Sequence, residues 1–180
     1  MANLFMSRRK QRTLLEQKYT RARMSLLVVI VFTFVNMALL GLQTGFYFPF
    51  SIFLPYLLMD MGMFLCGYYP PEAYEGLEDM VFSDQSVFVT YLIVAIVIAL
   101  CALIIFFLSG KNRVSGLTSA LVFIGLDTGV ILLFEGISLY SILDLLFHAW
   151  IIYELVMGIK AGNELKALNT KKRFGIFGRK

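Results

Sequence analysis

Polar side chains that could carry chemistry occur inside the apolar stretches of the C-terminal half. Asp144 and His148 are four residues apart, a spacing that places both on one face of a helix. Asp127 precedes Gly136 by nine residues and Asp144 follows it by eight, so in a helical hairpin both lie about 12–13 Å from that turn. Asn36 lies at a similar distance from the end of its own apolar stretch. The candidate functional site is therefore a polar layer made of Asn36, Asp127, Asp144 and His148.

Three interpretations of this polar layer are open. In the first, the side chains hydrogen-bond one another and fix the register of packed helices, a structural use of polar groups in lipid. In the second, Asp127, Asp144 and His148 hold a divalent cation with open positions, as a metal-dependent hydrolase requires. In the third, the same groups pass protons or ions across the membrane. Because zinc sites usually have more His or Cys ligands and His148 is the only histidine, no metal or other cofactor is predicted.

The elements that carry these residues are predicted to be helices that span a membrane. Hydrophobic residues make up 59% of the sequence and charged residues 16%, whereas soluble domains usually carry about 25% charged residues. The apolar runs are long enough to cross about 30 Å of hydrocarbon. We expect an all-α integral membrane protein with four transmembrane helices, at about residues 24–44, 87–108, 117–134 and 137–159.

Residues 46–66 form a further apolar stretch of a different character. Pro49 and Pro55 interrupt it, and Asp60 adds a charge. Proline disfavours a continuous helix, whereas a segment that enters and leaves the membrane on one side needs such interruptions. We therefore predict a re-entrant or interfacial segment on the outer side, followed by an acidic outer loop at residues 67–86. An ordinary fifth span is the alternative, since the stretch is long enough to cross.

The distribution of basic residues sets the predicted orientation. All 16 Lys and Arg residues fall before residue 24, at Lys111 and Arg113, or from Lys160 onward. Basic flanks favour the cytoplasmic side of a membrane. If residues 46–66 do not cross, every basic cluster falls inside and the acidic loop falls outside. We therefore predict a multi-pass plasma-membrane protein whose N- and C-termini are both cytoplasmic.

Both ends of the chain are basic. Residues 1–23 carry Leu14, Leu15, Tyr19 and Ala22 at helical spacing, which predicts a basic amphipathic helix on the cytoplasmic membrane surface. Residues 161–180 are predicted to form a basic cytoplasmic tail, so that the membrane domain covers residues 24–160. Basic ends that flank membrane spans favour binding to anionic lipid rather than to nucleic acid. The expected partners are the lipid bilayer and either another membrane protein or a second copy of the chain.

Small residues at four-residue spacing predict close contacts between helices, because backbones in lipid approach one another at such positions. The pairs are Gly41 and Gly45, Ala95 and Ala99, Gly125 and Gly129, and Gly158 and Gly162. The signal is weak in a membrane chain. Gly125 and Gly129 carry the most weight, because they bracket Asp127.

Other residues in the apolar stretches are interpreted structurally. Glu154 lies about 120° around the helix from His148 and is left outside the polar layer. Trp150 is predicted to pack between helices. Cys66 and Cys101 show no metal-ligand spacing, and both are expected to be small buried hydrophobic residues.

Parts of the sequence resemble a known but uncharacterised family. These parts are DLLFHAWIIY at residues 144–153, GIKAG at 158–162, the Asp127-Thr128 step, and the segment with Pro49 and Pro55. Together they resemble a family of small multi-span membrane proteins from Gram-positive bacteria. The resemblance covers most of residues 24–162, and it implies no activity, substrate or cofactor.

The sequence contains no P-loop, no Gly-rich dinucleotide turn, no HExxH motif and no nucleophile elbow. We therefore expect a non-enzymatic membrane component, either a partner subunit or a ligand-binding protein. The alternative is a small membrane-embedded hydrolase or an ion- or proton-coupled transporter. Either alternative would use the layer of Asp127, Asp144 and His148.

Overall fold

The computed structural model describes the chain except residues 1, 78, 111–112, 139–140 and 178–180, with side chains described over residues 9–170 apart from those gaps. The described residues form five α-helices and one short 3-10 helix, and no strand occurs among them. The elements are α1 (Ala2–Gly41), α2 (Phe53–Leu65), η1 (Pro71–Tyr74), α3 (Gln85–Leu108), α4 (Val114–Phe134) and α5 (Ser141–Phe177). Helices α1, α3, α4 and α5 are long and apolar enough to cross a membrane. The predicted all-helical class with four candidate spans is confirmed.

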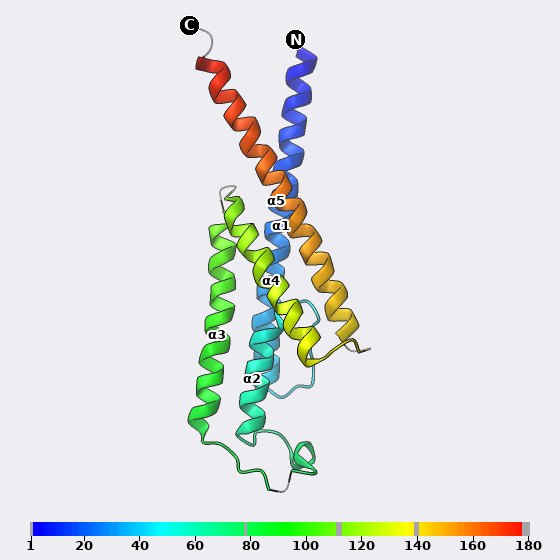
Figure 1. Ribbon diagram of the computed structural model, residues 1–180, viewed down its shortest axis with the longest axis vertical. Coiled ribbons are helices and arrows are strands. Elements are labelled where there is room, and N and C mark those ends of the chain that lie inside the picture. Colours follow the sequence, from blue (N-terminus) through cyan, green and yellow to red (C-terminus); the bar gives the residue numbers. More distant parts are fainter. Residues whose placement is uncertain (1, 78, 111–112, 139–140, 178–180) are drawn as a thin grey trace.

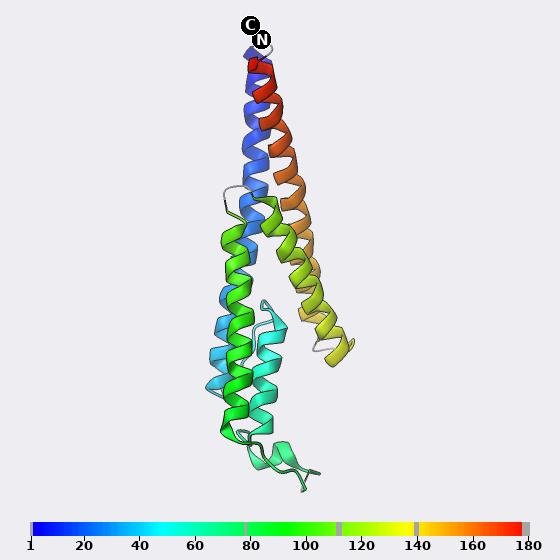
Figure 2. The ribbon, with the colours of Figure 1, turned by 60° about the vertical axis from the view of Figure 1, so that its left-hand side comes forward.

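The helices run roughly along the long axis of the molecule (Figure 1). The two termini lie at one end, and the loop that contains η1 lies at the other. Helix α1 packs mainly against α5, α2 against α3, and α4 against α5. Figure 2 shows α2 beside α3, and both are separated in this view from the hairpin of α4 and α5.

Helix α3 is fixed at both ends by polar contacts. At its start, the Asp84 carboxylate accepts a hydrogen bond of 2.8 Å from the Ser86 N–H, as a helix N-cap does. At its end, the Tyr19 hydroxyl donates to the carbonyl of Ser109 at 2.6 Å, and the Arg23 guanidinium donates to the Ser109 hydroxyl at 3.0 Å. A cation beside the C-terminus of a helix is favourable, because that end carries partial negative charge.

The basic first part of α1 is helical, and it continues without a break into the first apolar stretch. Its apolar face is covered by protein, because Leu15, Tyr19 and Ala22 are buried in a cluster that includes Leu165 of α5. Leu14, on another face, is exposed. Residues 161–177 likewise continue α5 as helix. The amphipathic pattern near the N-terminus therefore marks a helix–helix contact within this molecule.

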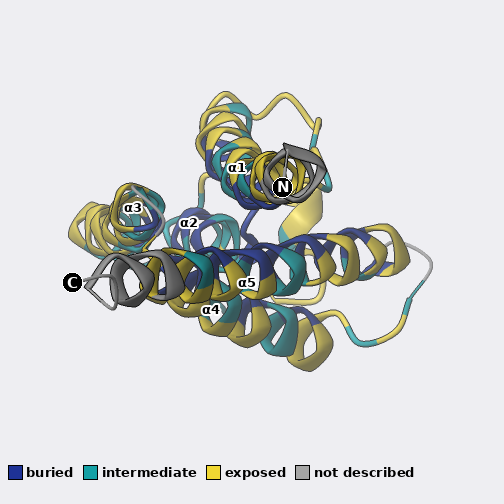
Figure 3. Ribbon diagram, turned by 90° about the horizontal axis from the view of Figure 1, so that it is seen from above, coloured by how far each residue is buried: buried dark blue, intermediate teal, exposed yellow. Residues whose placement is uncertain are grey.

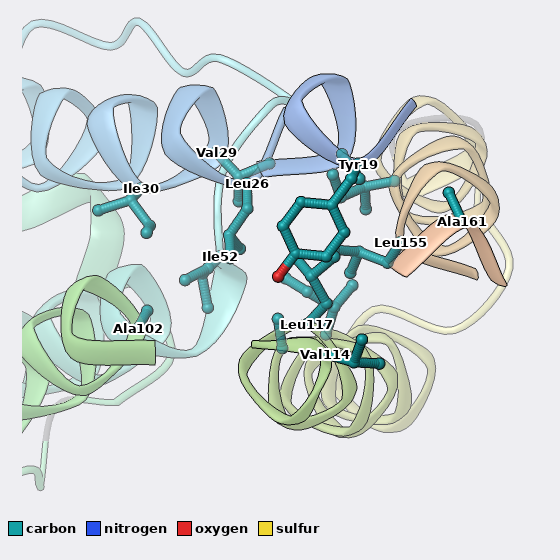
Figure 4. Close-up of a cluster of buried hydrophobic side chains, with 14 of the residues drawn as sticks. Tyr19, Leu26, Val29, Ile30, Ile52, Ala102, Val114, Leu117, Leu155 and Ala161 are labelled. Carbon is teal, nitrogen blue, oxygen red and sulfur yellow. The ribbon is translucent and has the colours of Figure 1, made fainter. Parts of the chain in front are cut away.

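Two groups of buried apolar side chains hold the bundle together. The larger group joins α1, α4 and α5 with Ala102 of α3 and Ile52, and Figure 4 shows the ring of Tyr19 among its members. The smaller group joins α1, α2 and α3 near the opposite end, and it consists of Met37, Leu40, Met59, Met63, Ala95 and Ala99. Seen from the end, buried residues lie on the sides of the helices that face one another (Figure 3). The predicted contact at Ala95 and Ala99 is confirmed, since both are fully buried.

The glycine pairs behave differently from one another. A Cβ added at Gly158 would clash with Ala22, and one added at Gly162 would lie 3.0 Å from the ring of Tyr19. This pair therefore allows α1 and α5 to approach closely. At Gly125 and Gly129 an added Cβ would meet no described heavy atom within 4 Å. The greater weight given to Gly125 and Gly129 was wrong, because they lie on a face of α4 that no described helix covers.

The segment after α1 turns back toward the middle of the bundle. The turn begins with Gln43 and Gly45 in the left-handed region, at φ 51° and 71°. Residues 46–52 then return beside α1, and α2 leaves in the opposite direction (Figure 1). Helix α2 has 13 residues, so it is only about 20 Å long, against about 30 Å of hydrocarbon. Pro55 does not interrupt this helix, because it lies in the first turn, where a missing N–H is tolerated.

Candidate functional site

Asp127 of α4 and His148 of α5 form the centre of the site. Their side chains come within hydrogen-bonding distance, with 2.9 Å between Oδ2 of Asp127 and Nε2 of His148. Both residues are almost fully buried, with 3% and 2% of their surface exposed. The hairpin of α4 and α5 therefore brings these two predicted residues into direct contact.

Asp127 also binds the start of α2. Its Oδ2 accepts a hydrogen bond of 2.8 Å from the Phe53 N–H, and its Oδ1 accepts one of 2.9 Å from the Leu54 N–H. The first N–H groups of a helix have no carbonyl partner within the helix, and they carry partial positive charge. The residue before α2, Ile52, supplies no side-chain cap. A carboxylate from another helix therefore caps α2.

The contact with the Asp144 carbonyl locates one proton of His148. Nδ1 is 2.8 Å from the backbone carbonyl oxygen of Asp144. A carbonyl only accepts hydrogen bonds, so Nδ1 carries a proton and donates it. One further proton must lie between Nε2 and the Asp127 carboxyl group, because two bare lone pairs at 2.9 Å would repel.

Asn36 holds the backbone that precedes α2. Its Oδ1 accepts from the Phe48 N–H at 2.9 Å, and its Nδ2 donates to the Phe48 carbonyl and to the Ser51 hydroxyl, each at 2.7 Å. One turn earlier on α1, the Thr33 hydroxyl accepts from the Ile52 N–H at 2.9 Å. These bonds satisfy backbone groups that are outside any helix. Asn36 thus belongs to the site, but it reaches Asp127 only through this segment.

Asp144 occupies a different position from the one predicted. Its backbone carbonyl binds His148, but its carboxyl group makes no hydrogen bond to Asp127 or to the imidazole among the described residues. Its Oδ1 is buried and has no hydrogen-bond partner in the part of the chain that the structure describes. The Tyr47 hydroxyl and the Glu135 carboxyl group lie near it. The predicted layer therefore divides into a bonded pair and a separate buried carboxyl group.

Glu154 has a partner that the sequence analysis missed. The guanidinium of Arg21 on α1 donates to its carboxylate at 2.5 Å, and Glu154 itself is buried. The pair joins α1 to α5 near the basic end of the bundle. A buried acid beside a run of basic residues signals an ion pair, but sequence spacing alone does not identify which cation provides it.

Two structural interpretations of single residues were wrong. Trp150 is 40% exposed, and its ring lies 5.1 Å from that of Phe147 on the same helix. Cys101 is exposed and Cys66 is half-buried. In a bundle that packs against lipid, apolar residues on the outer faces need no protein neighbour, so hydrophobicity does not predict burial among helices.

Ionisable groups outside the candidate spans are shifted by their surroundings. Hydrogen bonds from the backbone and side chain of Ser86 lower the pKa of Asp84. Burial raises the pKa of Glu135, which follows α4. Burial and the nearby Asp60 carboxylate, to which Tyr69 donates a hydrogen bond, raise the pKa of Tyr69. That bond explains how Asp60 is accommodated in an apolar stretch.

The geometry gives no support to the metal-site interpretation. Among the described residues, no three His, Cys, Asp or Glu side chains are grouped so that they could hold a metal ion. Both oxygens of Asp127 already accept backbone N–H groups, and Nδ1 of His148 already donates to a carbonyl. The bonds of Asp127, His148 and Asn36 serve instead to hold residues 48–54.

Comparison with known proteins does not narrow the function. No protein-family model, curated protein or solved structure matches the chain. The resemblance to a family of small multi-span proteins therefore stays a prediction. Any function must be argued from the geometry of the chain itself.

Proposed function

We propose that the protein is a non-enzymatic component of a bacterial plasma membrane, a partner subunit that presents residues 46–86 on the outer side. The observation that carries this proposal is which groups the polar side chains bind. Asn36, Thr33 and Asp127 all bind backbone groups of residues 48–54. Buried polar groups that are occupied in this way position a segment and leave little capacity for catalysis.

The proposal includes a re-entrant segment. Non-helical backbone at membrane depth is tolerated only where protein or water satisfies its polar groups. The side chains of α1 and α4 supply that satisfaction for residues 48–54. Helix α2 is also too short to span the hydrocarbon core. With this segment on one side, the positive-inside rule puts both termini in the cytoplasm.

The outer loop has the features of a contact surface. Val81 is 88% exposed, and Leu77 and Phe82 are also exposed. Acidic residues such as Glu72 and Glu75 lie on the same loop, and no Lys or Arg occurs between residues 23 and 111. Exposed apolar groups beside charge of one sign favour a protein partner with a basic surface.

A photo-crosslinking amino acid at Val81 tests this proposal in living cells. The matched control is the same amino acid at Leu133, which is 82% exposed on α4. We expect a discrete adduct with one other protein from position 81 only, and we expect Glu72→Lys combined with Glu75→Lys to reduce it. The absence of any protein adduct from position 81, or the same adducts from both positions, would contradict the proposal.

Proton-coupled transport is the second candidate function, and two observations favour it. Asp127 and His148 lie 2.9 Å apart in hydrogen-bonding contact, and Oδ1 of Asp144 is buried without a partner among the described residues. Purified protein in liposomes that contain a pH-sensitive dye distinguishes the two candidates. We expect no proton flux above that of empty liposomes. A flux that Asp144→Asn abolishes would favour transport and contradict the non-enzymatic subunit.

A further inference from the structure

A groove between α1 and α5 lies near the basic end of the bundle. Its volume is about 190 Å³. It is lined by Lys18, Arg21, Tyr153, Glu154 and Met157. No part of the polar layer contributes to it, so the groove is separate from the candidate site described above.

The groove crosses the boundary between basic and apolar parts of the chain. Helices α1 and α5 are antiparallel, and they approach closely at Ala22 and Gly158. Lys18 is four residues from Ala22 on the basic side, which is about 6 Å along the helix. Tyr153 is five residues from Gly158 on the apolar side, or about 7–8 Å. The groove thus has basic side chains at one end and an aromatic and apolar wall at the other.

The basic end of the groove has hydrogen-bond donors that no described residue uses. Arg21 uses one terminal nitrogen for the bond to Glu154, and a guanidinium carries five N–H donors. Because Glu154 is buried, the ion pair also fixes the position of the exposed Arg21 side chain. Lys18 is exposed and has no ion pair within the described residues. Lys18 and the free edge of Arg21 therefore provide positively charged donors at the mouth of the groove.

We infer that this groove binds an anionic phospholipid from the leaflet nearer the chain termini. Lys18 and Arg21 contact its phosphate, and its acyl chains follow Tyr153 and Met157. A positive charge directly above an exposed aromatic side chain and an apolar wall matches a lipid at the membrane interface. Glu154 acts as a positioning residue for Arg21. The inference does not rest on the proposed partner-subunit function.

Lipid retention by the purified full-length protein in detergent tests this inference. The probes are dioleoyl phosphatidylglycerol and, as the neutral comparison, dioleoyl phosphatidylcholine, with bound lipid counted by native mass spectrometry. Lys18→Gln removes one charge from the groove, and Lys10→Gln removes one from an exposed position of the same helix outside it. We expect Lys18→Gln to weaken phosphatidylglycerol binding about fivefold, as for one basic residue at an anionic surface. Lys10→Gln should have little effect.

A second variant keeps the test independent of folding. Arg21→Gln alone would leave Glu154 buried and unpaired, so it is combined with Glu154→Gln. The double variant should unfold at a similar temperature to the unmodified protein and yet lose the preference for phosphatidylglycerol.

Three results with the lipid probes would overturn the inference, and a fourth concerns soluble anions. They are equal weakening by Lys10→Gln and Lys18→Gln, equal retention of the two lipids by the unmodified protein, and an unchanged lipid preference in the double variant. Inorganic phosphate and glycerol phosphate are added as competitors, to test whether the groove binds a lipid phosphate or a soluble one. Displacement of the lipid by either soluble anion at a similar concentration would assign the groove to a soluble ligand.

Discussion

At the scale of single residues, Asp127 connects three parts of the chain. Its carboxyl group receives two backbone N–H groups from the start of α2 and faces the imidazole of His148. A carboxylate in an apolar environment is costly unless its lone pairs are occupied. Here they are occupied by a helix terminus and a histidine, so the cost is offset by local structure.

Replacing Asp127 by Ala should destabilise the protein strongly. The change would leave the N–H groups of Phe53 and Leu54 without partners and would strand His148 in the interior. We expect a loss of about 3–5 kcal/mol, the range for breaking a buried pair by removing one partner. Thermal unfolding in detergent measures it. Asp144→Asn is the control, because the Asp144 carboxyl group lacks these bonds, and an equal loss there would contradict the capping role of Asp127.

The triple variant Asp127→Asn, Asp144→Asn and His148→Gln separates structure from chemistry. Each change keeps the approximate shape of its side chain and removes an ionisable group. If the layer only positions residues 48–54, the variant should be less stable but should still complement a deletion strain whenever it is present in the membrane. Loss of complementation at normal protein levels would show that the layer has a chemical function.

The N-cap of α3 should respond to pH. The Ser86 hydrogen bonds lower the pKa of Asp84 below its ordinary value of 3.8. The stabilisation is therefore fully present above that ordinary value and is lost as the pH falls through the lower, folded-state pKa. Hydrogen exchange in the first turn of α3, corrected for the intrinsic rate, should accelerate in that acidic range. Asp84→Asn should remove the acceleration, and its persistence in that variant would contradict the assignment.

Spacing placed Asp127 and His148 in one polar layer, but it did not identify the contact between them or the role of Asp127. Equal distance from the turn at Gly136 paired Asp127 with Asp144, whereas the hydrogen-bonding contact is with His148, one helical turn deeper. The partners at Phe53 and Leu54 are backbone N–H groups, which every residue except proline possesses. No residue type marks them, so only the path of the chain reveals which helix start Asp127 caps.

At the scale of helices, identical spacing has opposite meanings on α4 and α5. Gly158 and Gly162 lie against α1, whereas Gly125 and Gly129 face no described helix. The spacing of small residues defines a stripe along one helix but not the direction in which that stripe faces. Which stripe becomes a contact depends on how the neighbouring helices are placed, and this is why the sequence favoured the wrong pair.

Alanine substitutions should separate the two stripes. In Gly158→Ala, the new methyl group would clash with Ala22, and we expect a loss of about 1–3 kcal/mol from overpacking. In Gly125→Ala, the methyl group meets open space, and the better helix propensity should give a gain of up to about 1 kcal/mol. Unfolding in detergent measures both. Ala22→Gly should rescue Gly158→Ala, and failure to rescue would contradict the proposed contact.

At the scale of the whole molecule, the four long helices were predictable, but the short helix α2 within residues 46–66 was not. Run length identified the candidate spans, and the prolines and charge pattern singled out residues 46–66. The helical basic end of α1 was predicted, although on the membrane surface, whereas the helical continuation of α5 over residues 161–177 was not, because that end is too polar to be distinguished from a flexible tail. These ends are helical in the structure, and the part of α1 around Tyr19 is held by contacts with α5 and α4.

Cysteine labelling tests the proposed orientation. Single cysteines at Glu75 and Arg113 are introduced after Cys66 and Cys101 have been replaced. Lys111, two residues before Arg113 in the sequence, lies outside the described residues. A membrane-impermeant reagent applied to intact cells should label position 75 but label position 113 only after permeabilisation. Labelling of both from one side would contradict the re-entrant segment, and the reverse pattern would favour five ordinary spans.

The cap on α2 has a consequence for how the protein is made. Asp127 is 74 residues later in the chain than Phe53 and 73 later than Leu54. The carboxyl group that accepts these hydrogen bonds is therefore synthesised well after the N–H groups that donate them. Residues 48–54 consequently cannot complete their hydrogen bonds until α4 has entered the bilayer. In nascent chains arrested before α4, a cysteine at Ser51 should react with a water-soluble reagent, and it should become protected once α4 and α5 are inserted. The last step of insertion would then be the docking of residues 48–54, after the helices on either side of this segment are in the bilayer.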